Sequence, residues 1–327
     1  MSRSTLRAEA WPLLGLAGAV VLWGTSFVAT KAALTGFGPL VVVGIRMLLA
    51  SAMMTALWPR LPAPRREAGD WRRLAVLAAM WPCVYFVLEG NALKLTTASQ
   101  AGTISALVPL LVAVGARIFL SERLARLAIV GLAISMAGVL ALSVGGPAES
   151  AAPNPALGNG LEVLAMVTYA ISTITLKSLV GRYNSWLLTG LQCLAGAVAF
   201  LPALLLMPMS EWQSVPPQAW AGALYLGLLV TLVPSGLYNM AVSRMPAGRA
   251  AMAINLVPVV ALISGWAIQG DTLSALQGIG CVAILGGVLL GQLRQAEGAP
   301  EGDASDLSEG ESATTRRAVE GSVSAPD

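Results

Sequence analysis

The sequence predicts an all-α integral membrane protein, in which ten transmembrane helices form two inverted repeats of five. Composition is the first observation, because 56% of the 327 residues are hydrophobic and only 11% are charged, whereas soluble domains carry about 25% charged residues. The second is that the charges fall in short gaps between long apolar runs. The third is a repeat inside the chain, described below.

Ten apolar runs have about the 20 residues that a bilayer-spanning helix needs. They cover residues 12–34, 38–58, 73–93, 98–119, 127–144, 158–177, 185–207, 218–242, 247–268 and 274–293. The first run follows Arg3 and Arg7, as in a signal peptide, but it is longer than the ~7–15 apolar residues of such a peptide. We therefore interpret it as an uncleaved first span.

These spans divide the chain into five parts. A cytoplasmic N-terminus (1–11) precedes the first repeat (12–144), and a linker (145–157) rich in Gly, Pro, Ala and Asn leads to the second repeat (158–293). Residues 294–327 are polar and lack hydrophobic periodicity, which predicts a disordered cytoplasmic tail.

The internal repeat is a gapless match between residues 92–141 and 241–290. Twelve of the 50 aligned positions are identical. The identities include two Leu-Val-Pro triplets at 107–109 and 256–258, two Gly-Val-Leu triplets at 138–140 and 287–289, and the pair Gly131 and Gly280. The first two spans of each half also align, at an offset of 146 residues. Such a repeat in a membrane protein is typical of transporters, whose substrate site lies between the halves.

The distribution of Lys and Arg predicts the orientation. If both termini are cytoplasmic, almost all basic loop residues lie inside and the outer loops hold essentially Lys94, as the positive-inside rule requires. Five spans per half is an odd number, so the halves insert in opposite senses. The aligned acids Glu122 and Asp271 then lie inside and outside respectively. We expect a multi-pass protein of a bacterial inner membrane.

The composition also excludes several kinds of site. The chain has no His, which removes His-based catalysis and the usual metal sites. Its three cysteines lie in apolar segments without metal-ligand spacing. No intramembrane catalytic group is evident, so we expect no enzyme, cofactor, metal or nucleic-acid partner. The expected partners are the lipid bilayer and a small-molecule substrate, with protons as a further candidate, and the protein is expected to be a monomer or homodimer.

Several motifs resemble those of the drug/metabolite transporter superfamily, EamA type. They are Trp23-Gly24-Thr25-Ser26-Phe27 with Lys31 and Arg46, Ala92-Leu93-Lys94 through Thr97-Ala98-Ser99, Val108-Pro109-Leu110, Ser121-Glu122-Arg123-Leu124, and in the second half Tyr238-Asn239-Met240-Ala241, Val257-Pro258 and Gly270-Asp271. Asp271 stands where Glu is more usual. The resemblance covers about residues 12–293.

This resemblance implies a secondary carrier that moves metabolites by alternating access without ATP. We expect export of small polar or amphipathic metabolites, such as amino acids or compounds derived from them, driven by the substrate gradient or by exchange with protons. An importer in the same fold and a membrane protein that does not transport are the alternatives.

Glu89 is the first candidate for substrate binding or coupling, because a charge within a span costs roughly 2.5–3.5 kcal/mol and usually faces a cavity or partner. It is interpreted as a proton-coupling carboxylate, as a contact for a substrate ammonium, or as one half of a structural ion pair with Arg46 or Lys31. Glu162, near the outer start of the sixth span, is its nearest competitor. Arg46 and Lys31 could hold a substrate carboxylate; a helix-packing role for Arg46 and snorkelling for Lys31 are the alternatives.

The remaining candidates are polar or aromatic residues within spans. They are Trp23 and Ser26 in the first span, Tyr169 in the sixth, Gln192 in the seventh (aligned with Arg46), Tyr238 (aligned with Glu89) and Asn239 in the eighth, and Asn255 in the ninth. Pro109 and Pro258 each remove a helical hydrogen bond, and so predict a kink that is either a flexible point for alternating access or a static feature.

Cysteine labelling tests the predicted topology. A single cysteine at position 271 should react with a membrane-impermeant maleimide added from outside, and one at position 122 should not. The opposite pattern would overturn the inverted arrangement of the two halves.

Overall fold

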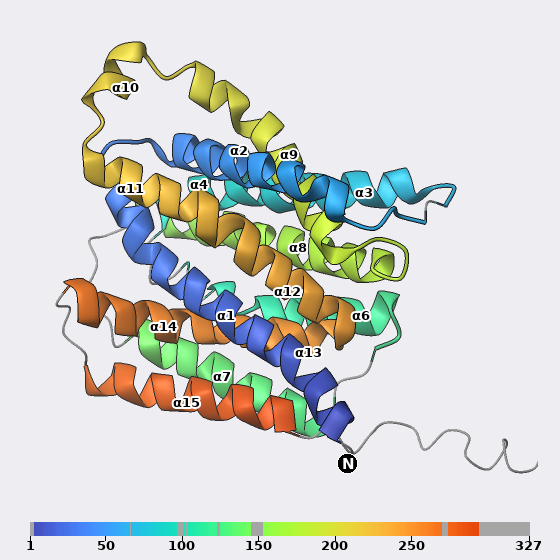
Figure 1. The fold of residues 1–327 in the computed structure, drawn as a ribbon. Coiled ribbons are helices and arrows are strands. Elements are labelled where there is room, and N and C mark those ends of the chain that lie inside the picture. Colours follow the sequence, from blue (N-terminus) through green and yellow to red (C-terminus); the bar gives the residue numbers. More distant parts are fainter. Residues whose placement is uncertain are drawn as a thin grey trace, which may run out of the picture. The chain divides into compact units, whose positions relative to one another are not determined.

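A computed structural model describes residues 3–65, 67–96, 101, 104–122, 125–144, 153–269 and 274–293 (Figure 1). This part of the chain is helical and contains no strand. The helices of the first half are α1 (Arg3–Ala33), α2 (Pro39–Leu57), α3 (Asp70–Ala78), α4 (Tyr85–Leu95), α6 (Val108–Phe119) and α7 (Arg126–Val144), with a 3₁₀ turn η1 (Trp58–Arg60) and a π-helical segment η2 (Ala79–Val84).

The second half repeats this order. Its helices are α8 (Pro155–Leu179), α9 (Ser185–Leu205), α10 (Met209–Ser214), α11 (Pro217–Tyr225), α12 (Leu232–Arg244), α13 (Ala247–Met252), α14 (Val257–Ser264) and α15 (Ala275–Leu293). The π-helical segments η3 (Leu226–Thr231) and η5 (Gly265–Gln269) and the 3₁₀ segment η4 (Ala253–Leu256) join several of them into longer spans.

In the described residues, nine helical stretches are long and apolar enough to cross a membrane, and α6 is a shorter apolar helix. Together they confirm the predicted all-α fold with ten spans. The fourth span differs in detail from the continuous run 98–119: its described helix begins only at Val108, after a turn at Leu107. Pro109 lies in the first turn of α6, where its missing N–H group leaves no helical bond unmade.

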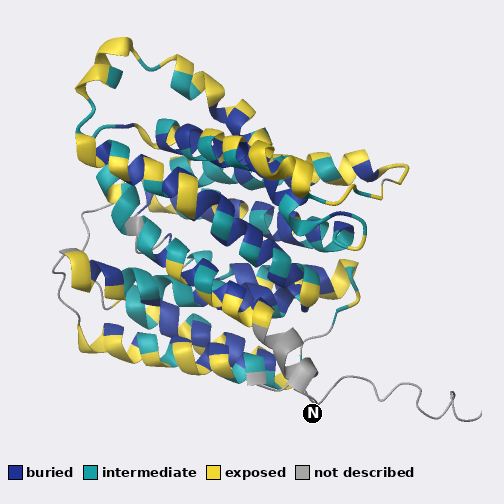
Figure 2. Cartoon of the chain, viewed as in Figure 1, coloured by how far each residue is buried: buried dark blue, intermediate teal, exposed yellow. Residues whose placement is uncertain are grey.

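Burial supports a membrane environment. Figure 2 shows exposed positions along α15 and other helices. Many exposed residues are large and apolar, for example Ile279, Val282 and Leu289 on α15, which are 64%, 70% and 60% exposed. A water-soluble protein would leave few such patches uncovered. Because lipid tails are apolar, this surface is the expected one for a bilayer.

The repeated sequence motifs occupy equivalent places in the two halves. Both Leu-Val-Pro triplets begin a helix: Leu107 and Leu256 are the N-cap residues of α6 and α14, and each proline follows in the first turn. The eighth span has its π-helical segment η3 at about the position that η2 has in the third span. The duplication seen in the sequence is therefore also a duplication of local backbone geometry.

The glycines of the repeat bring α7 and α15 into close contact, and the two helices lie side by side in Figure 1. A Cβ atom on Gly131 would lie 2.4 Å from the carbonyl oxygen of Gly287, and one on Gly287 would lie 2.5 Å from that of Gly131. Gly138 and Gly280 approach each other in the same reciprocal way, at 2.8 and 2.7 Å. Since Gly131 aligns with Gly280 and Gly138 with Gly287, the contact is symmetric about the pseudo-two-fold axis.

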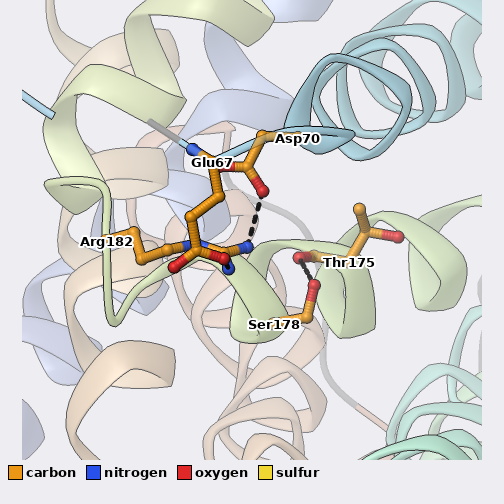
Figure 3. A network of polar contacts seen from close by, with 5 residues as sticks. All are labelled: Glu67, Asp70, Thr175, Ser178 and Arg182. Atoms are coloured by element: carbon orange, nitrogen blue, oxygen red, sulfur yellow. Dashed lines mark hydrogen bonds and ion pairs between the residues drawn. The ribbon is translucent and has the colours of Figure 1, made fainter. Parts of the chain in front are cut away.

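Polar side chains tie the two halves together at the end predicted to be cytoplasmic. Arg182, which follows α8, forms ion pairs with Glu67 and with Asp70, the latter at 2.6 Å (Figure 3). Lys177 lies 3.7 Å from Glu122 and donates to the carbonyl groups of Val242 and Met245 at 2.7 Å. The ion pairs of Arg182 and Lys177 thus link the two halves at this end.

The glycine contact predicts a stability difference between two adjacent positions. Gly287→Ala should lower the stability of the folded protein by roughly 1–3 kcal/mol, because the new methyl group overlaps the backbone of α7. Gly286→Ala is the matched control, since a Cβ atom there meets nothing within 4 Å. Thermal unfolding of both variants in detergent measures the difference. Equal melting temperatures would contradict the close approach of the helices.

Candidate functional site

A small cavity lies between the halves, where spans from both repeats meet. Its lining residues come from five helical elements: Trp23 on α1, Trp81 on η2, Tyr169, Ser172, Thr173 and Leu176 on α8, Gln192 on α9, and Ser235, Tyr238 and Asn239 on α12. The cavity leaves about 20 Å³ for the centres of water molecules, and one water needs about 10–15 Å³ by this measure. The cavity therefore has room for little more than one water molecule in this structure.

A break in the third span supplies backbone groups to this site. Trp81 has φ −132° and ψ 124°, which are not helical angles, and the next residue is Pro82. The break leaves carbonyl groups free to bind side chains from the second half. The Trp81 carbonyl accepts a hydrogen bond from Gln192 Nε2 at 3.4 Å, and the Leu77 carbonyl accepts one from Ser172 Oγ at 3.3 Å. Irregular backbone inside a membrane is found where it lines a cavity.

Buried amide groups form a network on the second half. Asn239 Nδ2 donates to Gln192 Oε1 at 3.1 Å and to Thr189 Oγ1 at 2.8 Å. Gln192 Nε2 also donates to Ser172 Oγ at 3.1 Å. These bonds hold neutral donors and acceptors at the cavity wall without placing a charge there.

Aromatic rings form the opposite part of the wall. The Tyr238 ring lies 5.6 Å from that of Trp23 and 6.2 Å from that of Tyr169, measured between centroids. Its hydroxyl group is buried and makes no hydrogen bond of standard geometry to a described residue. The side chains of Thr173 and Tyr169 lie close enough to interact with this hydroxyl group.

Two opposite charges lie beside the cavity on the first half. Tyr85 Oη donates to Glu89 Oε1 at 2.6 Å, and the Tyr85 ring lies 6.0 Å from the Tyr169 ring at the cavity wall, with the ring planes inclined by 60°. Arg46 Nε donates to Thr231 Oγ1 at 3.1 Å, and its guanidinium carbon lies 5.7 Å from the centre of the Phe86 ring. Arg46 and Glu89 attract each other electrostatically. They form no direct ion pair within 4 Å, although both side chains belong to the described part of the chain.

The charged pair of the first half aligns with residues at the cavity wall in the second half. Arg46 aligns with Gln192, and Glu89 with Tyr238, whose neighbour Asn239 binds Gln192. The first half therefore presents a cation and an anion where the second half presents neutral hydrogen-bonding groups. This asymmetry gives the site a charged end and an uncharged, aromatic end.

The structure gathers some predicted site residues and separates others. The predicted residues that line the cavity are Trp23, Tyr169, Gln192, Tyr238 and Asn239. Arg46 and Glu89 lie beside the cavity, where Tyr85 binds Glu89 and the ring of Phe86 contacts Arg46. The functional roles of all these residues stay predictions.

Other predicted residues lie elsewhere. Ser26 donates to the Trp23 carbonyl at 2.6 Å within α1, Lys31 is exposed in the last turn of α1, and Asn255 donates to Ser135 Oγ at 2.9 Å, away from the cavity. Pro109 and Pro258 begin α6 and α14. Asp271 lies outside the described residues.

Sequence reasoning missed several residues of the site. Trp81, Thr173, Leu176 and Ser235 line the cavity, and Tyr85 binds Glu89. Two signals were present: Tyr85 lies four residues before Glu89, the spacing of neighbours on one helix face, and Trp81 precedes a proline, which disfavours helical geometry. Thr173, Leu176 and Ser235 carry no such signal in the sequence.

In the described residues, no group of three or more His, Cys, Asp or Glu side chains is arranged to hold a metal ion.

Comparison with known proteins places this arrangement in a family. An exporter of Streptantibioticus cattleyicolor, described as a probable terminal-alkyne amino-acid exporter, is 26% identical over 83% of this chain and 90% of its own. A probable amino-acid metabolite efflux pump of Salmonella typhimurium is 27% identical over 83% of this chain and 91% of its own. An uncharacterised transporter of Bacillus subtilis is 24% identical over 87% of each chain.

A protein of known crystal structure shares the fold, with a TM-score of 0.72 and 19% identity over 87% of this chain and 98% of its own. The model of the EamA-like transporter family matches the chain twice, over residues 10–144 and 156–291. These matches confirm the resemblance predicted from the motifs and identify a multi-pass membrane protein of a transporter family. Since the two matches cover most of the chain, one in each half, this protein belongs to the EamA-like transporter family.

Proposed function

We propose that this protein is a secondary active transporter that exports small zwitterionic metabolites, amino acids or compounds derived from them, across the bacterial inner membrane. The observation that carries the proposal is the pair Arg46 and Glu89, which lie near each other beside the central cavity without a direct ion pair. An amino acid has the complementary pair of charges on its own backbone.

The chemistry of the two side chains assigns an orientation to such a substrate. A guanidinium group binds a carboxylate through two parallel hydrogen bonds, so the substrate carboxylate lies at Arg46. Its ammonium group lies at Glu89, whose other oxygen is free of the Tyr85 bond. The apolar part of the substrate then faces the rings of Trp23, Tyr169 and Tyr238.

The free-energy cost of placing Arg46 and Glu89 within spans supports a functional role for both charges. Each charge within a span costs roughly 2.5–3.5 kcal/mol on insertion scales, and a direct ion pair would lower that cost. Arg46 and Glu89 instead have separate partners, Thr231 and Tyr85. This arrangement supports binding of a ligand whose own carboxylate and ammonium groups would pair with the two side chains. The relatives described as an amino-acid exporter and an amino-acid metabolite efflux pump support the same substrate class and direction.

We infer alternating access from the contacts between the halves at one end of the bundle and from the small size of the cavity. The bonds of Arg182 and Lys177 close the end predicted to be cytoplasmic, and the cavity is too small for a metabolite. Transport then requires these bonds to break as the halves rock about the cavity. Import by the same cycle is the alternative. We also assign both termini to the cytoplasm, including the tail at 294–327, which we propose is dispensable for transport.

Metabolite profiling of overexpressing cells tests function and direction. Wild-type protein should raise the concentration of at least one amino-acid-like compound in the medium, and Glu89→Gln at matched membrane levels should not. Glu211→Gln is the control, because Glu211 is exposed on α10. Depletion of the compound from the medium would show import. Identical profiles for wild type and Glu89→Gln would count against a role of Glu89 in transport.

Substrate analogues test the assigned orientation. Once a substrate is known, Arg46→Gln should raise its KM by roughly 10- to 150-fold, the effect of losing a charge-assisted hydrogen bond, but should hardly change the KM of the decarboxylated amine. Glu89→Gln should weaken binding of both compounds, since each retains the ammonium group. Counterflow in proteoliposomes measures these constants. If Arg46→Gln affects both compounds equally, the carboxylate does not lie at Arg46.

A further inference from the structure

Glu162 is an acidic side chain that the proposed substrate site does not use. It lies on α8, about two turns from the start of the helix at Pro155. Its side chain is only 2% exposed, and its Oε2 atom makes no hydrogen bond to a described residue. A charged carboxylate in such a position is disfavoured, because burial removes water and no described residue donates a hydrogen bond to Oε2 in its place.

Tight packing of α8 against α4 keeps water from reaching Glu162 from the side. A Cβ atom on Gly158 would lie 2.7 Å from the backbone nitrogen of Thr96. Thr96 Oγ1 also donates to Asn159 Oδ1 at 2.5 Å, and the backbone N–H of Asn154 donates to the Leu95 carbonyl at 3.1 Å. The outer ends of the two helices are therefore joined one turn above Glu162.

The groups that face Glu162 are acids and phenols. From α4, Glu89 repels it through its charge, and Tyr85 interacts with both carboxyl groups. Tyr169 lies further along α8 and contacts Tyr85. Of the basic residues on the packed helices α4 and α6, Lys94 and Arg117 are exposed at helix ends. Among the described residues, no cation is paired with Glu162.

A count of charges identifies where a proton is needed. At the inner end, Lys177 pairs with Glu122, and Arg182 with Asp70 and Glu67. Away from the helix ends, the described spans contain Arg46, Glu89 and Glu162, which is one base and two acids. Glu89 has a hydrogen bond from Tyr85 and the attraction of Arg46. The Oε2 atom of Glu162 has no such partner among the described residues, and this difference favours Glu162 as the carboxyl group that takes up a proton.

We propose that Glu162 is the proton-binding site of this transporter, and that one proton enters the cell on Glu162 for each substrate that leaves. The proposal rests on the export function proposed above. In the outward-facing state, the Glu162 carboxylate takes a proton from external water. In the inward-facing state, the carboxyl group returns that proton to cytoplasmic water, and no other reactant is required.

Repulsion between the two acids couples this proton to the substrate. When Glu162 is ionised, two carboxylates face one another, and the substrate ammonium near Glu89 offsets the excess negative charge. When Glu162 is protonated, that excess is gone and the ammonium is held less strongly. Proton uptake outside thus favours substrate release there, and proton loss inside favours substrate binding.

Labelling with dicyclohexylcarbodiimide tests the proton site without any knowledge of the substrate. This apolar reagent modifies protonated carboxyl groups in membrane interiors. Applied to the purified full-length protein, it should modify the peptide that contains Glu162, more slowly as pH rises, and should leave the exposed Glu211 unmodified. Mass spectrometry locates the label, and Glu162→Gln should remove it. Modification of Glu89 in place of Glu162, or no modification of Glu162 at any pH, would overturn the proposal.

Transport assays then separate proton coupling from substrate binding. In proteoliposomes, Glu162→Gln should retain exchange of substrate for substrate but lose its acceleration by an inward proton gradient. Glu89→Gln should lose both activities. Retention of gradient-driven transport by Glu162→Gln would disprove coupling through Glu162. If wild-type protein transports no metabolite while Glu162 is still labelled, the export function fails and the proton site stands.

Discussion

A lipid bilayer offers no hydrogen-bond partners to a polypeptide backbone, and the structure of this protein follows from that constraint. The described parts of the spans are helical over most of their length, since a helix satisfies its own N–H and C=O groups. The third span departs from helical geometry at Trp81, and there the freed carbonyl groups bind Gln192 and Ser172 from the second half. The break and the cavity therefore depend on each other.

Duplication produced a scaffold that is more symmetric than the site it holds. Gly131 and Gly138 meet Gly287 and Gly280 in reciprocal contacts, and the two Leu-Val-Pro triplets begin equivalent helices. Close packing tolerates no larger side chain at such contacts, so both copies kept the same residues. The residues beside the cavity have no such restriction, and there the first half has Arg46 and Glu89 where the second has Gln192 and Tyr238.

Because of this difference in charge, the two halves contribute different groups to the proposed site. The first half contributes Arg46 and Glu89, and the second contributes neutral amides, aromatic rings and the buried Glu162. Glu89 has partners that stabilise its charge, whereas the Oε2 atom of Glu162 has none among the described residues. In the proposed mechanism, these different surroundings suit one carboxyl group to bind a cation and the other to exchange a proton.

The sequence by itself determined the fold class, the ten spans and the internal repeat, because hydrophobic length and aligned triplets are local properties of the chain. It also pointed to Arg46, Glu89 and Tyr238, since a charged or aromatic residue within an apolar run is visible without a structure. Only the tertiary structure showed that Arg46 and Glu89 are not directly paired and that Asn255 binds Ser135 away from the cavity. It also revealed Trp81 as a lining residue and Glu162 as a buried acid without a cation. These properties depend on which helices meet and at what rotation, and packing between distant segments decides both.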